Sequence, residues 1–392
     1  MLFQTFDEKE QCVAFYADGK IHKELPLSDL SKTWNYSQYL KNSDIQYADL
    51  YCLGRSMEDV CPEELREQWK SVYGKLLAFY RSFTESKISL QDNCFYDLVP
   101  ERFLLLYCDL KDKITEYVLN SFQKPENYDF LLKIKKFATD IRFRELNLDF
   151  SNVKLTSKIR KPYKTLKAAK PYIDYNIFGT KTGRLTTKAG SFPILTMQKS
   201  LRSVIKPHND CFLELDFNAA ELRTVLALLK GTQPSIDLHE WNVNNVYGDS
   251  LTREQAKKRI FAWLYNPNSK DDLSERFYDR GKIKESFFDG TEVKTTFNRR
   301  IKADDFHAFN YIIQSTSSDL FLEQVIKVYD YLRDKKSNIA FTIHDSLIID
   351  FDKDELSSLK ELSNIFSQTR FGEYLVNLKI GKDFGAMKEW KL

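Results

Sequence analysis

Apolar positions in the first half of the chain occur in two kinds of segment. Residues 11–16 and 20–25 flank the turn signal at residues 17–19, which predicts a β-hairpin. Residues 65–150 repeat apolar positions at helical spacing, and two prolines divide them into shorter pieces. We therefore expect a small β element followed by a mainly helical region.

The second half of the chain mixes strand and helix signals. Residues 211–217 alternate like a strand, and residues 218–230 form a helical pattern that ends at Gly231. Asn218 and Glu221 have the spacing of a capping box, so we expect them to cap this helix. Two more helices and a strand–turn–strand segment are predicted at residues 251–264, 309–332 and 341–351.

Composition identifies a folded protein but not its partner. The chain has 392 residues with 42% hydrophobic and 14% aromatic content, which is enough for two or three core units. The net charge of +3 is too small to predict nucleic-acid binding by itself, so the distribution of charge matters more.

Cysteine spacing and the N-terminus bear on the cellular compartment. The six cysteines form no C-x-x-C pair and have no metal-like spacing with the histidines, so we expect reduced thiols. No basic region followed by an apolar run opens the chain, and no segment is apolar enough to span a membrane. We expect an intracellular (cytoplasmic) protein.

One tract is basic throughout. Seven cationic residues occur there without an acidic residue, and Tyr163 lies among them with Tyr172 just beyond. A solvated linker is one interpretation, and a surface facing nucleic-acid phosphates is the other. The cations are Lys154, Lys158, Arg160, Lys161, Lys164, Lys167 and Lys170.

Two aspartates end strand-like segments far apart in the sequence. Asp216 lies at the end of the strand predicted for residues 211–217, and Asp345 lies near the turn of residues 341–351. Either could simply be a cap or turn residue. Together, two carboxylates could bind a pair of divalent ions, with Mg²⁺ expected from the oxygen ligands.

The helix predicted at residues 251–264 has a distinctive face. Arg253, Lys257, Phe261 and Tyr265 follow one another at intervals of four, which places them on one gently curving stripe. Cations can bind phosphate oxygens, and an aromatic ring can pack on a sugar or base. The alternative is a solvated basic face whose aromatic residues belong to the core.

From about residue 172 to residue 390, the chain resembles the polymerase region of family A DNA polymerases, the DNA polymerase I family. Six segments occur in the family's order. They are Thr182-Gly183-Arg184-Leu185 (T-G-R-L), Asp216–Arg223 (motif A), Asp237-Leu238-His239 (D-I-H), the stripe of residues 253–265 (motif B), Asn310-x3-Gln314-x-Thr316-x2-Asp319 (N-x3-Q-G-T-x2-D) and His344-Asp345 (H-D-E of motif C).

The resemblance implies an α+β fold, a right-hand polymerase with an antiparallel-sheet palm, helical fingers and a helical thumb. The expected domains are an N-terminal extension of unknown role at 1–90, a thumb at 91–170, a palm at 171–230 and 301–392, and fingers at 231–300. A monomer is expected.

The resemblance also implies template-directed DNA synthesis from dNTPs on primer–template DNA, with release of pyrophosphate. Asp216 and Asp345 would hold two Mg²⁺ ions, and Lys257 would protonate the pyrophosphate. The dNTP would be bound by Arg253, Lys257, His239, Phe261, Tyr265 and Glu221, the last of which would exclude ribonucleotides. DNA would be contacted by Arg184, Asn310, Gln314 and His344, and by the cations Lys158, Arg160, Lys161 and Lys164 of the basic tract.

The chain departs from the family pattern in motif C and at its N-terminal end. Ser346 replaces the usual carboxylate, and Glu214, two residues before Asp216 on the same strand face, could partly substitute for it. No segment has the Asp-x-Glu strand of a proofreading exonuclease, so we expect none in this chain. A separate exonuclease or a processivity factor is then a conceivable partner, as for a compact polymerase encoded by a phage.

Two other functions stay open at this point. The missing motif C carboxylate is compatible with a catalytically impaired, polymerase-like DNA-binding protein. A single-subunit RNA polymerase has a related palm, but Glu221 and Phe261 argue against it, because a polymerase that uses ribonucleotides must leave room for the 2′-hydroxyl.

Overall fold

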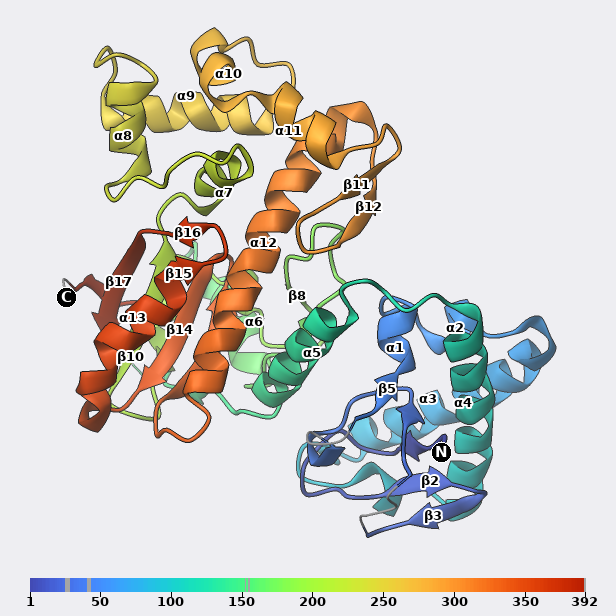
Figure 1. Ribbon diagram of the computed structural model, residues 1–392. Coiled ribbons are helices and arrows are strands. Elements are labelled where there is room, and N and C mark those ends of the chain that lie inside the picture. Colours follow the sequence, from blue (N-terminus) through green and yellow to red (C-terminus); the bar gives the residue numbers. More distant parts are fainter. Residues whose placement is uncertain (25–28, 41–43, 152, 154–155, 391–392) are drawn as a thin grey trace. The chain divides into compact units, whose positions relative to one another are not determined.

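The computed structural model describes residues 1–24, 29–40, 44–151, 153 and 156–390. The chain divides into two compact units, Met1–Phe143 and Arg144–Leu392, which are treated separately below (Figure 1). Within the described part of the chain, no helix is both long and apolar enough to cross a membrane.

The first unit contains the predicted hairpin. Asp18 and Gly19 both have positive φ (49° and 76°), which is the backbone that a two-residue hairpin turn requires. The hairpin is confirmed, and its second strand ends at His22, whereas Leu25 lies outside the described residues. A third strand pairs antiparallel with it, and two short strands pair in parallel: β1 (Gln4–Thr5), β2 (Phe15–Ala17), β3 (Lys20–His22), β4 (Lys32–Thr33) and β5 (Gln46–Tyr47).

The helical region predicted for residues 65–150 is confirmed in its main part. Pro100 stands directly before the first residue of α4, where its missing N–H costs nothing. Buried residues recur along α4 at three- and four-residue spacing, as on a helix with one apolar face. The helices of this unit are α1 (Ala48–Tyr51), α2 (Met57–Val60), α3 (Arg66–Glu85), α4 (Glu101–Ser121) and α5 (Tyr128–Arg142).

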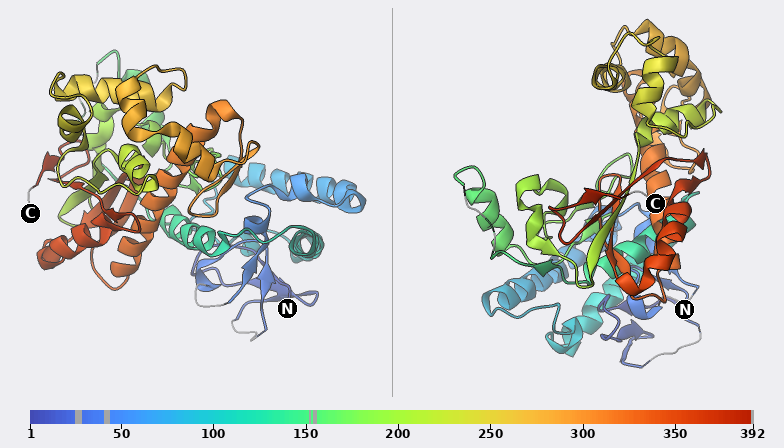
Figure 2. Two further views of the ribbon diagram at one scale, coloured as in Figure 1. Left: turned by 45° about the horizontal axis from the view of Figure 1, so that its top comes forward. Right: turned by 90° about the vertical axis from the view of Figure 1, so that its left-hand side faces the viewer.

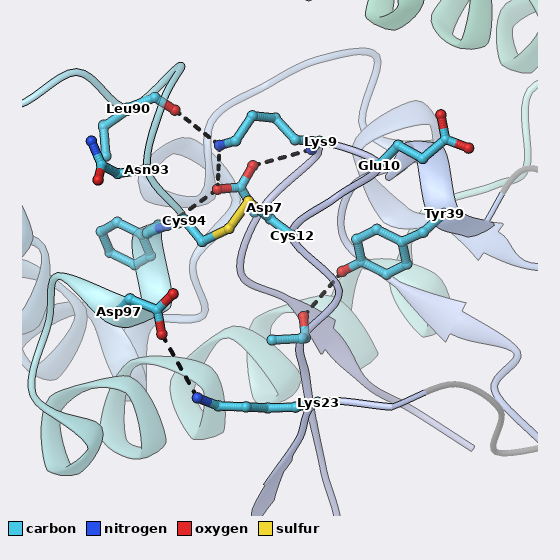
Figure 3. The surroundings of a disulfide bond; sticks show 12 residues. Asp7, Lys9, Glu10, Cys12, Lys23, Tyr39, Leu90, Asn93, Cys94 and Asp97 are labelled. Carbon is cyan, nitrogen blue, oxygen red and sulfur yellow. Dashed lines mark hydrogen bonds and ion pairs between the residues drawn. A yellow bond between two sulfur atoms is a disulfide. The ribbon is translucent and has the colours of Figure 1, made fainter.

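A disulfide joins Cys12 and Cys94, so the expectation of six reduced thiols was wrong for these two (Figure 3). The two cysteines are 82 positions apart and carry no spacing signal, because the fold, not the local sequence, brings the hairpin region next to the segment before α4. A buried ion pair lies alongside: Lys9 Nζ donates to Asp7 Oδ2 at 2.6 Å, and the same carboxylate accepts from the backbone N–H of Phe95. The other four cysteines are free and buried.

The second unit is built on a five-stranded antiparallel sheet, with strand order β13-β14-β10-β17-β18 (Figure 1). The strand predicted for residues 211–217 is confirmed as β10, which lies in the middle. Because β10 is paired on both sides, its polar residues Glu214 and Asp216 are surrounded by neighbouring strands. The strands are β10 (Cys211–Phe217), β13 (Asn338–Ile343), β14 (Ser346–Phe351), β17 (Val376–Gly381) and β18 (Lys388–Glu389).

Helices cover this sheet and extend beyond it. α13 (Leu359–Ser367) packs on β10 and β17, and α12 (Asp305–Tyr331) packs against α13 and α7. Figure 2 shows the helices α8–α11 gathered at one end of α12, away from the sheet. These helices are α7 (Ala220–Leu228), α8 (Leu238–Asn245), α9 (Arg253–Tyr265), α10 (Asp272–Tyr278) and α11 (Arg280–Phe287).

Shorter elements complete the second unit. They are α6 (Arg160–Ala168) and the paired strands β6 (Asn147–Leu148), β9 (Ile205–Lys206), β7 (Tyr175–Asn176), β8 (Thr186–Thr187), β11 (Glu292–Lys294), β12 (Arg300–Lys302), β15 (Gln368–Thr369) and β16 (Gly372–Glu373).

The predicted capping box at the start of α7 was wrong. Ala219 is the N-cap, in a left-handed conformation (φ 51°) without a side-chain cap. The Asn218 side chain instead donates a hydrogen bond to Asp237 and accepts one from the backbone N–H of Leu238. Glu221 is likewise bound to other side chains, described below.

Helices and antiparallel strands occur in separate groups, so the predicted α+β class is confirmed. The boundary between the compact units falls at residue 143, within the segment expected to form the thumb. The names palm, fingers, thumb and N-terminal extension stay predictions.

Candidate active site

The two aspartates lie at the same end of the sheet. Asp216 is the last but one residue of β10, and its partner across the β10–β14 pair is Ser346. Asp345 directly precedes Ser346 in the tight turn between β13 and β14. The strand register therefore gathers motif A and motif C at one end of the sheet.

The Asp216 carboxylate is held from both neighbouring strands. Ser346 Oγ donates to Asp216 Oδ1 at 2.8 Å, and Asn377 Nδ2 of β17 donates to Oδ2 at 3.4 Å. Glu214 lies on the same strand face, with Oε1 3.2 Å from Ser346 Oγ and Oε2 3.2 Å from Lys379 Nζ. Burial raises the pKa of Asp216 and the Glu214 charge adds to this, whereas the two hydrogen bonds oppose it.

Asp345 directly follows a residue with an unusual backbone conformation. His344, which precedes it, has a left-handed conformation (φ 53°) and an exposed side chain. Burial raises the pKa of Asp345; the charge of Arg184 opposes the shift, and that of Glu221 reinforces it. Asp345 is thus within electrostatic range of residues from two other predicted motifs.

Glu221, on the first turn of α7, is the point where these motifs meet. Its buried carboxylate accepts hydrogen bonds from the guanidinium of Arg184 and from the hydroxyl of Tyr265. Burial, followed by the Glu221 charge, raises the pKa of the Tyr265 hydroxyl, so it stays a donor. Segments predicted as T-G-R-L and motif B thereby bind the Glu221 carboxylate of motif A, and Asp345 of motif C lies within electrostatic range of it.

The stripe on α9 is exposed along the face that the four-residue spacing predicted. Arg253, Lys257 and Phe261 are half-buried, and Tyr265 is 46% exposed. The core side of the helix is formed by other residues, namely Ala256, Ile260, Trp263 and Leu264. Lys257 Nζ lies 5.8 Å from the centre of the Phe261 ring, a cation–π distance.

His239 faces this stripe from the first turn of α8. Its ring meets Phe261 edge to face with centres 5.4 Å apart, and its buried Nδ1 has no hydrogen-bond partner among the described residues. Burial lowers the pKa of His239 to about 4, and the nearby charges of Lys257 and Arg253 contribute in the same direction.

Arg253 forms an ion pair with Asp237, the N-cap residue of α8. Its Nε and Nη2 donate to the two carboxylate oxygens of Asp237 at 3.1 and 2.9 Å. Asn218, next to the end of β10, donates to the same carboxylate at 2.8 Å. Although burial opposes ionisation, these hydrogen bonds hold the pKa of Asp237 well below its usual range.

A buried ion pair that the sequence did not reveal supports the loop of Arg184. Arg299 donates twice to the fully buried carboxylate of Asp319 on α12, at 2.8 and 2.6 Å. Gly183 has φ 79°, and a Cβ there would lie 2.4 Å from Arg299 Nη2. Arg299 lies eleven residues before Asn310, the nearest residue of a predicted motif, and in an irregular segment, so no spacing could single it out.

The remaining predicted contacts are placed as follows. Asn310 and Gln314 are half-buried on α12, one helical turn apart. Lys158 and the helix α6 residues Arg160, Lys161 and Lys164 are exposed, whereas Lys154 lies outside the described residues. Among the residues that the structure describes, no contact links these cations to the aspartates, and their role in DNA binding stays a prediction.

The donor set at the sheet end suits a hard cation. Asp216 and Asp345 supply carboxylate oxygens, and Mg²⁺ typically binds one or two carboxylates together with substrate phosphates. Among the described residues, no group of three or more His, Cys, Asp or Glu side chains is arranged to hold a metal alone. Any metal here would therefore complete its coordination with ligands from elsewhere.

An antiparallel sheet with two aspartates at one end, linked through Glu221 to a helix with a cationic and aromatic face, defines a candidate active site of the polymerase type. No family model matches the chain. In sequence it is similar to "DNA polymerase I, thermostable" of Thermus thermophilus (23% identical, 57% of this chain and 33% of the relative) and to DNA polymerase I of Borreliella burgdorferi (22% identical, 79% of this chain and 43% of the relative). These relatives confirm the predicted resemblance to DNA polymerase I.

The chain thus spans about a third to under half of the length of these relatives. A solved structure, the POL domain of Pol1 from M. smegmatis in complex with DNA primer-template and dNTP, is similar over 70% of this chain and 54% of that chain, with 15% identity and a TM-score of 0.46.

Proposed function

We propose that the chain catalyses template-directed DNA synthesis, transferring nucleotides from dNTPs to a primer 3′-hydroxyl. The observation that carries this proposal is that Glu221 binds Arg184 and Tyr265 from two distant segments and lies within electrostatic range of Asp345 from a third, in a chain similar to DNA polymerase I. Such convergence is what an enzyme that handles primer, template and nucleotide at one point requires.

The proposed role of each residue follows from the chemistry of its side chain. Arg253 and Lys257 offer donors to a triphosphate, and the unpartnered Nδ1 of His239 offers a polar atom on the same face. Lys257 would hold the proton that the departing pyrophosphate accepts. Phe261 would pack on the nucleotide sugar, and Tyr265 would lie near the templating base.

Glu221 is proposed to select deoxyribonucleotides by occupying the space beside the 2′ position. The hydrogen bonds from Arg184 and Tyr265 fix its side chain, so the carboxylate cannot swing away at little cost. Arg184, Asn310, Gln314 and His344 would contact the primer–template, and the exposed cations of α6 with Lys158 would bind its phosphates.

Asp216 and Asp345 are the residues that would hold two Mg²⁺ ions together with the nucleotide phosphates. When bound, such ions lower the pKa of the attacking hydroxyl and neutralise charge that develops on the phosphates. We further propose that this chain has no proofreading activity and acts as a monomer.

Primer extension tests the proposal. A labelled primer–template is incubated with Mg²⁺ and either dNTPs or rNTPs, with the parent, Asp345→Asn and, as a control, Asp330→Asn on α12, whose exposed carboxylate pairs with Arg333. We expect extension by dNTPs only and a loss of at least about 1,000-fold in Asp345→Asn, because a lost metal ligand removes several kcal/mol of stabilisation.

The control variant should extend primers like the parent. Extension by rNTPs would contradict the role of Glu221. A parent that binds primer–template tightly but does not extend it would favour the second candidate, a catalytically impaired DNA-binding protein. Ser346, where the motif usually has a carboxylate, is the observation that favours this candidate.

A further inference from the structure

The strand register places three polar side chains in one row across the sheet. Ser346 of β14 and Asn377 of β17 are the residues directly opposite Asp216 of β10, one on each side. Directly opposite residues in an antiparallel pair point to the same face, with Cβ atoms about 5 Å apart. Asp216 is therefore flanked by a hydroxyl and an amide.

Each of the two flanking groups reaches a different carboxylate oxygen. Ser346 Oγ is 2.8 Å from Oδ1, and Asn377 Nδ2 is 3.4 Å from Oδ2. A carboxylate has about four lone-pair sites, so each oxygen keeps one site for a cation after accepting one hydrogen bond. The arrangement fixes the rotation of the carboxylate without filling its capacity as a ligand.

Glu214 lies two residues before Asp216 on the same face of β10, and it interacts with a different neighbour, Lys379. Its Oε2 lies 3.2 Å from Lys379 Nζ, and Lys379 is its directly opposite residue on β17. Ser346 has one hydroxyl proton, and the nearer acceptor is Asp216 rather than Glu214, whose Oε1 is 3.2 Å away. The Glu214 charge is thus compensated by Lys379, which disfavours Glu214 as a direct metal ligand.

We propose that Ser346 and Asn377 are positioning residues that hold the Asp216 carboxylate in place from the two neighbouring strands, in place of the missing motif C carboxylate. This inference rests on the proposed function, because it assigns Asp216 to the metal ions of that reaction. Groups that orient a metal ligand in this way typically change metal affinity or activity by about 10- to 100-fold when removed.

The test measures metal binding without turnover. Mn²⁺ is titrated, with detection by electron paramagnetic resonance, into the protein bound to a primer–template with a dideoxy-terminated primer and the matching dNTP. The variants are Ser346→Ala and Asn377→Ala, with Ser346→Thr as the conservative variant that keeps the hydroxyl. Ser358→Ala is the matched control, because its buried hydroxyl donates to Glu355 O away from the row.

We expect the Kd for Mn²⁺ to rise about 10-fold in both alanine variants and to stay near the parent value in Ser346→Thr and Ser358→Ala. Affinity for the primer–template should not change. A purely structural role would lower thermal stability and leave the Kd for Mn²⁺ unchanged. If Ser346→Ala does not fold, Asn377→Ala decides, since Asn377 is partly exposed on β17.

The outcomes separate the two proposals. If the parent binds Mn²⁺ and extends primers, but both alanine variants bind the metal as tightly as the parent, the positioning role is overturned and the proposed function stands. If the parent complex binds no Mn²⁺ and extends no primer, the proposed function is overturned and this inference with it.

Discussion

Removing Arg299 tests whether the buried ion pair with Asp319 supports the second unit. The Asp319 side chain is fully buried and that of Arg299 is 11% exposed, so neither charge is well solvated. Arg299→Met would leave the carboxylate with no charged partner at 2.6–2.8 Å. Breaking a buried pair on one side costs about 3–5 kcal/mol, because the remaining charge is uncompensated.

The pH dependence of this cost has a definite sign. Burial already raises the pKa of Asp319, and the Arg299 charge opposes that shift, so its removal raises the pKa further. A carboxyl with a raised folded-state pKa binds its proton more tightly in the folded chain. The stability lost in Arg299→Met should therefore be largest above that pKa and shrink as the pH falls.

Native-state hydrogen exchange of α12 peptides measures the free energy of opening near Asp319, in the parent and in Arg299→Met at pH 8 and pH 5.5. The control is Arg333→Met, which removes an exposed ion pair to Asp330 of the same helix and should cost less than about 1 kcal/mol. The double variant Arg299→Met/Asp319→Leu should regain most of the loss, since it leaves no buried charge.

The reasoning would be refuted by a loss below about 1 kcal/mol in Arg299→Met. It would also be refuted if the double variant were no more stable than the single one. Either result would mean that Asp319 finds water or another partner once Arg299 is gone.

Three other predictions concern separate parts of the chain. Glu221→Ala should lower discrimination against rNTPs in primer extension at least about 10-fold, equal to about 1.4 kcal/mol, because it empties the space beside the 2′ position; unchanged discrimination would contradict the assignment. The folded-state pKa of His239, about 4, is below its unfolded value, so the parent should lose roughly 3 kcal/mol as the pH falls from about 6.5 to 4. Urea unfolding of His239→Gln should lack this part of the loss, and an identical pH profile in both proteins would disprove it. Reduction of the Cys12–Cys94 disulfide should destabilise the first unit by roughly 4–5 kcal/mol, as expected for a sequence separation of 82. If the Cys12→Ser variant unfolded at the same urea concentration as the parent, this prediction would be wrong.

The sequence correctly predicted the elements whose signals lie within one short stretch of residues. The strand β10 and the helix α9 follow directly from alternation and from four-residue spacing, and the hairpin follows from its turn residues. Helix α9 also shows how four-residue spacing identifies one face of a helix. Its stripe stays at the surface because a different set of residues fills the core.

Features that depend on pairing between distant segments could not be predicted. The capping-box spacing at Asn218 was misleading, since tertiary partners on α8 compete for the same side chain. The Cys12–Cys94 disulfide and the Arg299–Asp319 pair share this property. In each case the partner is set by chain topology, which residue spacing does not encode.

The departure at Ser346 illustrates the same dependence at the candidate site. A slip of one residue between β10 and β14 would set Asp345 or Leu347 opposite Asp216 and turn the serine to the other face. The register between β10 and β14 keeps Ser346 opposite Asp216 on one side. On the other side, the register between β10 and β17 places Asn377 opposite Asp216. Asn377→Ala in β17, outside every recognised motif, should therefore affect the site as strongly as Ser346→Ala next to Asp345.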